Sequence, residues 1–218
     1  MNTRNSFNEK LESIRHDIMV MAVKVEEDLD RAVAALKTNN VEQAEMVKAN
    51  DAVINALQIR IEDETAMVIA TEQPVAGDLR ELVSVFKIAA NLERAGDYTV
   101  HLAKAAIKLQ CEPAFRFVEH LERMAAVCRD IMRLSINAYI ARNAEAARDA
   151  AGLDNIIDME HKELIAAVLK FIKKNPGLVK KAVRILNASG YLERFGDHIT
   201  NICEGVIYMV ESTREELN

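Results

Sequence analysis

The chain alternates between long stretches with helical apolar spacing and short polar breaks. The breaks fall where Asn, Pro or Gly occurs, at residues 38–40, 72–74, 110–113, 141–143 and 173–177. All three prolines lie in these breaks, as expected because proline is disfavoured in a helix interior. The pattern predicts an all-α protein with six helices, over residues 6–37, 41–71, 75–110, 114–141, 144–174 and 178–213.

The second half of the chain repeats the first. The sequence LERAGD at residues 92–97 returns as LERFGD at 192–197, a spacing of 100 residues. Earlier in each half, Asp51 corresponds to Asp154 at a spacing of 103 residues. Long helices with short connections form antiparallel bundles. We therefore predict a tandem duplication of two antiparallel three-helix bundles. The predicted repeats are residues 1–112 and 113–218.

Acidic residues recur within an apolar helix stripe. At 100° per residue, Glu93 and Asp97 fall within about 40° of Leu79, which we take as the centre of that stripe. Glu193 and Asp197 repeat this placement in the second half. The pattern predicts that these carboxylates occupy positions that packing would otherwise give to aliphatic side chains.

Such carboxylates need a compensating positive charge, because burying an unpaired one costs several kcal/mol. Arg94 and Arg194 directly follow their glutamates and so are expected to point about 100° away. A multivalent cation between residues i and i+4 would neutralise both acids. Asp51 and Asp154 share faces with apolar residues of their own helices and join the candidate ligands. The alternatives are a solvated acidic face and a purely structural bundle.

Gly96 and Gly196 occupy the same site in the two repeats. Glycine inside a helix costs about 1 kcal/mol relative to alanine. Its presence at both sites predicts crowding, by either a neighbouring helix or a ligand close to the backbone.

Composition narrows the class of protein. Half of the residues are hydrophobic, only 5% are aromatic and the net charge is −6. An acidic chain without a basic cluster in its sequence is not suited to nucleic acid or to anionic lipid. The first residues lack the apolar core of a secretory signal. Cys111, Cys128 and Cys203 form no CxxC pair and are read as reduced, core-filling thiols. These features favour a cytoplasmic protein.

The doubled LERxGD pattern resembles the PhoU family. The segment PVAGDLR at residues 74–80, followed by FKI at 86–88, is similar to another stretch of that family. The resemblance covers essentially the whole chain. It implies a cytosolic negative regulator of phosphate uptake and phosphate-starvation signalling. The implied partners are the nucleotide-binding subunit of a phosphate ABC transporter and a sensor histidine kinase. The implied assembly is a homodimer that meets the membrane only through these partners.

The resemblance also implies a set of metal ligands. The family's E(D)-x-x-x-D motifs fall on three pairs, Glu93 with Asp97, Glu193 with Asp197, and Asp154 with Asp158. The fourth motif departs from the pattern, since Asp51 is followed one turn later by the neutral Asn55. Oxygen ligands suit magnesium, manganese or iron better than zinc. Divalent or trivalent ions of these metals are therefore the expected cofactors.

Two other functions remain open at this point. One is an accessory regulator of an ion-coupled phosphate carrier, which the sequence cannot distinguish from a partner of an ABC transporter. The other is a carboxylate-bridged di-metal enzyme, as found in some helical bundles. Such enzymes usually carry E-x-x-H motifs on two helices. Neither of the predicted helices 75–110 and 178–213 contains that motif.

Overall fold

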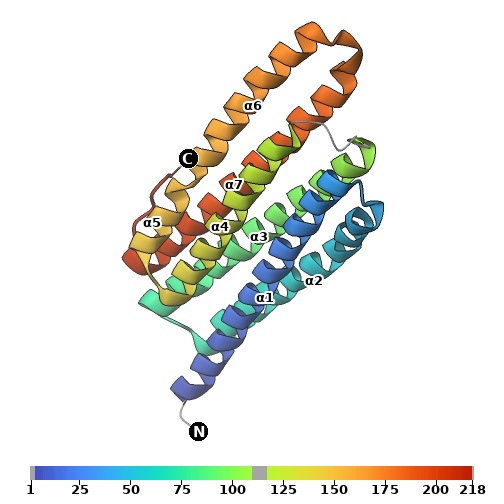
Figure 1. The fold of residues 1–218 in the computed structure, drawn as a ribbon. Helices are drawn as coiled ribbons and strands as arrows, with labels where there is room; N and C mark the ends of the chain where they lie inside the picture. Colours follow the sequence, from blue (N-terminus) through green and yellow to red (C-terminus); the bar gives the residue numbers. More distant parts are fainter. Residues whose placement is uncertain (1–2, 110–116, 218) are drawn as a thin grey trace.

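The computed structural model describes residues 3–109 and 117–217, and all of its regular elements are helical (Figure 1). The all-α prediction is confirmed. The elements are α1 (Thr3–Thr38), α2 (Val41–Glu72), α3 (Ala76–Leu109), α4 (Val118–Ala141), α5 (Ala144–Gly152), α6 (Asp154–Lys174), the short 3₁₀ helix η1 (Pro176–Leu178) and α7 (Val179–Glu211). No helix among the described residues is long and apolar enough to cross a membrane.

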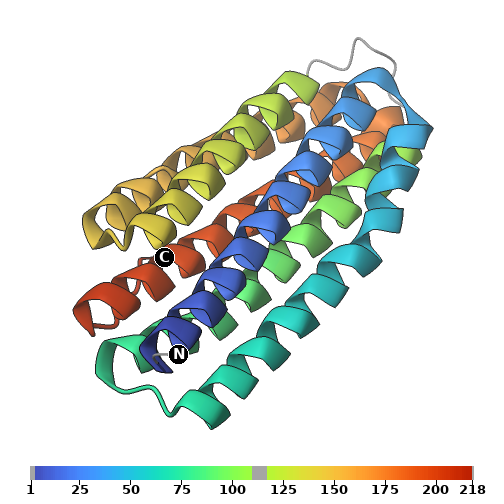
Figure 2. The ribbon, with the colours of Figure 1, turned by 90° about the horizontal axis from the view of Figure 1, so that it is seen from below.

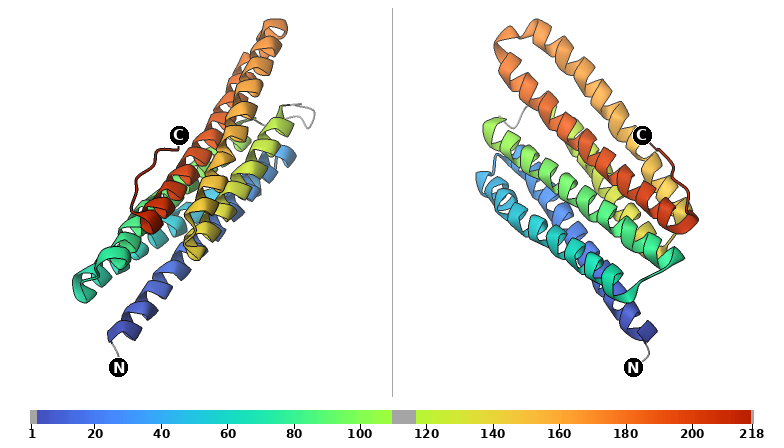
Figure 3. Two further views of the ribbon diagram at one scale, coloured as in Figure 1. Left: turned by 90° about the vertical axis from the view of Figure 1, so that its left-hand side faces the viewer. Right: turned by 180° about the vertical axis from the view of Figure 1, so that it is seen from behind.

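The helices form two neighbouring groups, α1–α3 and α4–α7, which confirms the predicted duplication (Figure 1). The long α3 and α7 pack against each other between the groups, and α1 lies beside α4 (Figure 2). After α7 the chain turns back along the bundle (Figure 3). The predicted boundary between residues 112 and 113 lies outside the described residues.

Aromatic side chains join α3 to α7 near the middle of this contact. The Tyr98 ring stacks on His198 with centroids 5.6 Å apart and on Tyr191 at 6.4 Å. His198 Nδ1 lies 2.9 Å from Asn91 Oδ1. The two equivalent helices of the repeat therefore run antiparallel and meet around an approximate twofold axis.

Equivalent caps start the second helix of each group. The side chain of Asn40 accepts a hydrogen bond from the Gln43 amide at 3.1 Å, and that of Asn143 accepts one from Ala146 at 3.0 Å. An asparagine that accepts from the third residue of a helix satisfies an otherwise unpaired amide. The predicted breaks at residues 38–40 and 141–143 are confirmed.

The predicted continuous helix over residues 144–174 is wrong at one point. Leu153 separates α5 from α6, and the backbone tightens there into three-residue turns. The Leu153 amide donates to the Ala150 carbonyl at 3.1 Å, and Ile156 donates to Leu153 at 3.0 Å. Gly152 immediately precedes the break and lowers the local helix preference. The interruption makes Asp154 the first residue of α6.

The predicted apolar stripe of α3 is also wrong in position. Leu79 and Val83, which we took to face the core, are 37% and 43% exposed. The buried face is instead formed by Leu82, Ile88 and Leu92. Because α3 packs against α1, α2 and α7, its buried face is wide and turned away from Leu79. The acids of α3 therefore lie at the edge of the core rather than inside it.

Cys128 and Cys203 are free thiols buried in the core, which confirms their predicted role. Cys111 lies outside the described residues.

Candidate functional site

What we call the first cluster is formed by α2 and α3 and consists of the acidic residues Asp51, Glu93 and Asp97 together with the neutral Asn55. Glu93 and Asp97 are partly buried, with 17% and 33% of their side-chain surfaces exposed. Burial raises the pKa of Glu93, and the nearby charges of Asp97 and Asp51 raise it further. The structure therefore brings the predicted carboxylates of this repeat into electrostatic contact across two helices.

Arg94 compensates part of this negative charge, which corrects the prediction that it points away. Its guanidinium donates to Asp97 Oδ2 at 3.1 Å and lies 3.6 Å from Glu93 Oε2. The Arg94 side chain is 61% exposed, so solvent weakens the compensation.

The acidic residues of α6 and α7 form the second cluster, consisting of Asp154, Asp158, Glu193 and Asp197. Burial raises the pKa of Asp154 to about 7, and the charges of Asp197, Asp158 and Glu193 add to the effect. The pKa values of Glu193 and Asp197 are raised by burial and by neighbouring acids as well. Lys162 pairs with Asp158 at 3.0 Å but is itself largely exposed. The charge of Arg194 acts in the opposite direction on Glu193 and Asp197. The second cluster thus holds four carboxylates whose negative charge is partly compensated.

Gly196 allows the second cluster to form. A Cβ atom at Gly196 would lie 2.3 Å from Asp154 Oδ1 and 2.9 Å from Ile157 Cδ1. At Gly96, the equivalent Cβ would meet Ile54 Cδ1 at 3.3 Å, a tight but adjustable contact. Both glycines admit a neighbouring helix, which confirms the predicted crowding. Only Gly196 also admits a carboxylate.

One acid that acts on the first cluster was missed. The charge of Glu62 on α2 also acts on Glu93. Glu62 follows Asn55 by seven residues and therefore lies on the same helix face. That spacing could have revealed it. The equivalent position in the second repeat is Ile165. The additional acid is therefore present in the repeat that has Asn55 where the other has Asp158.

The first cluster also contains an unsatisfied polar atom. Asn55 Oδ1 is buried and accepts no hydrogen bond from the described residues. A buried amide oxygen without a donor is costly and suits a cation. Within residues 3–109 and 117–217, however, no three His, Cys, Asp or Glu side chains are already gathered closely enough to hold an ion. Ligation would therefore require the carboxylate side chains to rotate toward one another.

The second cluster predicts that the stability of the metal-free protein depends on pH in an unusual way. The pKa of Asp154 is about 7 in the folded chain and 3.8 in its ordinary state. Between these values the folded chain holds a proton that the unfolded chain has released, so stability falls as pH rises. We expect the melting temperature in chelator to fall from pH 5 to pH 8, and to fall less in Asp154→Asn. Equal pH slopes for the two proteins, measured by calorimetry, would contradict this interpretation.

Fold and clusters together define a tandem-repeat helical bundle with one carboxylate cluster in each repeat. Comparison with known proteins agrees. The family model described as the PhoU domain matches residues 18–106 and again residues 121–206. The phosphate-specific transport system accessory protein PhoU homolog of Clostridium acetobutylicum is 30% identical over 99% of both chains. The corresponding homolog of Pseudomonas putida is 32% identical over 95% of this chain and 81% of its own.

Solved structures are similar over nearly the whole chain. The crystal structure of PhoU from Pseudomonas aeruginosa matches with a TM-score of 0.90 and 31% identity, covering 95% of this chain and all of that one. The phosphate transport system regulatory protein PhoU from Streptococcus pneumoniae matches at 0.89 and 27% identity, covering 96% and 99% of the two chains. The chain belongs to the PhoU family. It is accordingly a regulatory accessory protein and not an enzyme.

Proposed function

We propose that this chain restrains phosphate uptake and phosphate-starvation signalling as a metal-binding adaptor. The observation that carries the metal part is the second cluster, where burial and the charges of neighbouring acids raise the pKa values of Asp154, Glu193 and Asp197 despite the opposing charge of Arg194. A bound cation removes this repulsion, and ligands that must be deprotonated bind it more strongly as pH rises.

The first cluster supports a second ion. The residues that would hold it are Asp51, Asn55, Glu93 and Asp97, with Glu62 close by. The buried Asn55 Oδ1, which lacks a donor among the described residues, is a fitting neutral ligand. Arg94 already supplies one positive charge here. Asn55 is neutral where the second cluster has Asp158, so the first cluster should bind its ion more weakly than the second. All of the ligands are oxygens, which favours magnesium, manganese or iron over zinc.

The proposed partners are the nucleotide-binding subunit of a phosphate transporter and a sensor histidine kinase in the cytoplasm. The curated relatives are named as accessory proteins of the phosphate-specific transport system, which supports the first partner. A homodimer is supported by the outer face of α2, where Val53, Ile59 and Met67 are 42%, 59% and 63% exposed. Exposed apolar residues gathered on one helix face are typical of a protein contact surface.

A reporter of phosphate-starvation genes tests the proposal. Deleting the gene should raise reporter expression in high phosphate, and the wild-type gene should restore repression. The Asp97→Ala/Asp197→Ala variant should restore it poorly, because each cluster loses a ligand. The matched control is Asp63→Ala/Asp149→Ala, which removes two charges at exposed sites. Unchanged expression after deletion would contradict the regulatory role. Full repression by the cluster variant would contradict the role of the metal.

A further inference from the structure

A small basic cavity lies between α3 and α7. Its volume is about 150 Å³. The described side chains that line it and can donate a hydrogen bond are His101, Lys104, Lys108, Arg184, Asn187 and Tyr191. None of the described lining residues is a carboxylate. In a chain with a net charge of −6, this concentration of cations is unusual.

The cations of this cavity have no acidic partner among the described residues. Arg184 donates to the backbone carbonyl of Lys108, which holds its guanidinium at the cavity. Lys104 and Lys108 are exposed, and neither pairs with an acid of the described chain. Lys108 lies in the last turn of α3, whose dipole is negative at that end. The antiparallel α7 starts nearby at Val179 and brings its positive end to the same region.

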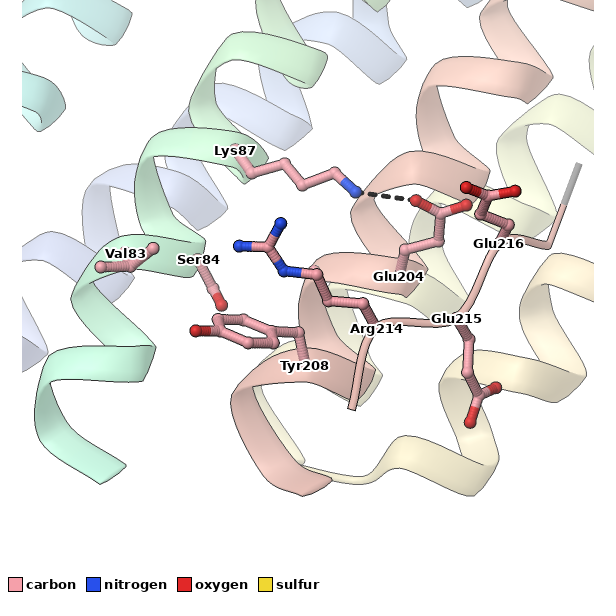
Figure 4. A pocket seen from close by; sticks show the side chains of 9 residues that line it. Val83, Ser84, Lys87, Glu204, Tyr208, Arg214, Glu215 and Glu216 are labelled. Carbon is pink, nitrogen blue, oxygen red and sulfur yellow. Dashed lines mark hydrogen bonds and ion pairs between the residues drawn. The ribbon is translucent and has the colours of Figure 1, made fainter. Parts of the chain in front are cut away.

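The repeat provides an internal comparison. The pseudo-equivalent cavity, of about 380 Å³, lies at the other end of the α3–α7 contact (Figure 4). There Lys87 pairs with Glu204 at 2.7 Å, and Arg214 lies over the Tyr208 ring at 5.3 Å. The segment after α7 lines this cavity and adds Glu215. Lys87 is therefore neutralised by an acid of its own cavity, Arg214 stacks on an aromatic ring, and Glu215 pairs with Arg148 of α5.

The two cavities differ at equivalent positions spaced by 100 residues. Lys104 stands where the other cavity has Glu204, and Lys108 stands where it has Tyr208. Arg184 stands in place of Ser84. Each of these three differences adds positive charge to the same cavity, whereas Asn187, which stands where the other cavity has Lys87, removes one positive charge. Since the two repeats have the same helical fold, packing alone does not require these cations.

We propose that this cavity binds a phosphate group, carried either by inorganic phosphate or by a small phosphomonoester. Every polar side chain that lines it can donate, and a tetrahedral oxyanion accepts from several donors at once. The guanidinium of Arg184 and the two ammonium groups supply charge-assisted hydrogen bonds. The volume is below the 300–1,000 Å³ that is typical of sites for drug-sized ligands, which favours a small anion. This site is independent of the proposed metal clusters.

Isothermal titration of the full-length, chelator-treated protein tests the proposal. Inorganic phosphate and glycerol phosphate are titrated separately at constant ionic strength. The variants are Lys104→Gln and Arg184→Ser, the second of which copies the residue of the other repeat. Each should weaken binding about tenfold or more, because a charge-assisted hydrogen bond is lost. The matched control, Lys87→Gln, removes the same charge from the other cavity and should leave affinity unchanged.

The two probes identify the source of the phosphate group. Tighter binding of inorganic phosphate indicates the free ion, and tighter binding of glycerol phosphate indicates a phosphorylated metabolite. Absence of binding by both probes overturns the proposal. The proposal is also overturned if phosphate affinity is unchanged in Lys104→Gln and Arg184→Ser. Loss of phosphate binding in Lys87→Gln overturns it as well. Thermal melts of each variant confirm that a loss of affinity does not reflect unfolding.

Discussion

Replacing Glu81 by glutamine should destabilise this protein more than any change at the acidic clusters. The Glu81 side chain is completely buried, yet it meets two arginines. Arg15 of α1 donates to Oε1 at 2.7 Å, and Arg142, which follows α4, donates to Oε2. Removing one partner of a buried ion pair costs about 3–5 kcal/mol. For a chain of this size, that lowers the melting temperature by roughly 6–20 °C.

A matched control is available on the same arginine. Glu12 also pairs with Arg15, at 2.5 Å, but its side chain is 67% exposed. Glu12→Gln should change stability by less than about 1 kcal/mol, since exposed ion pairs contribute little. Calorimetry or urea denaturation measures both variants. Equal shifts in the two proteins would show that burial does not set the strength of the Glu81 interaction.

Gly196→Ala should have the largest effect on metal content. The new Cβ would occupy the position of Asp154 Oδ1, so the carboxylate must rotate away from Glu193 and Asp197. Mutating a residue that orients a metal ligand typically weakens metal affinity about 10–100-fold. The fold should persist, because the clashing atoms are the ends of side chains and alanine favours helix. Elemental analysis of protein reconstituted with manganese or iron measures the loss.

Gly96→Ala is the control, because the added Cβ meets only Ile54 and Val25 side chains. Metal content should stay close to that of the wild type, with a small change in melting temperature. Similar metal content in Gly196→Ala and the wild type would place the ion elsewhere. No bound metal in any protein, including the wild type, would refute the metal part of the proposed function.

Duplication followed by divergence explains the differences between the repeats. The first cluster has Asn55 where the second has Asp158, and it gains Glu62 and the Arg94 pair. The two ends of the α3–α7 contact have acquired charges of opposite sign. Lys104 at one end is the repeat equivalent of Glu204 at the other. A single scaffold thus presents environments of different charge at equivalent places.

Patterns along the sequence predicted several features of the site correctly. The separation of four residues between Glu93 and Asp97 predicted that they share one helix face. The repeat predicted the same for Glu193 and Asp197. The same method misplaced the stripe around Leu79, because a helix packed on three sides has apolar residues around most of its circumference. It also missed the helix break at Leu153, since the spacing of apolar residues does not show where the backbone forms three-residue turns.

The sequence by itself determined the helical class, the duplication and the family, because these depend on spacing, breakers and repeated motifs within the chain. Tertiary structure decided which acids are partly buried, and that Glu81 unites Arg15 with Arg142. It also decided that Lys104 and Arg184, 80 residues apart, line one cavity. The physical reason is that burial and the sum of nearby charges depend on how separate helices pack, and spacing within one helix does not specify that packing.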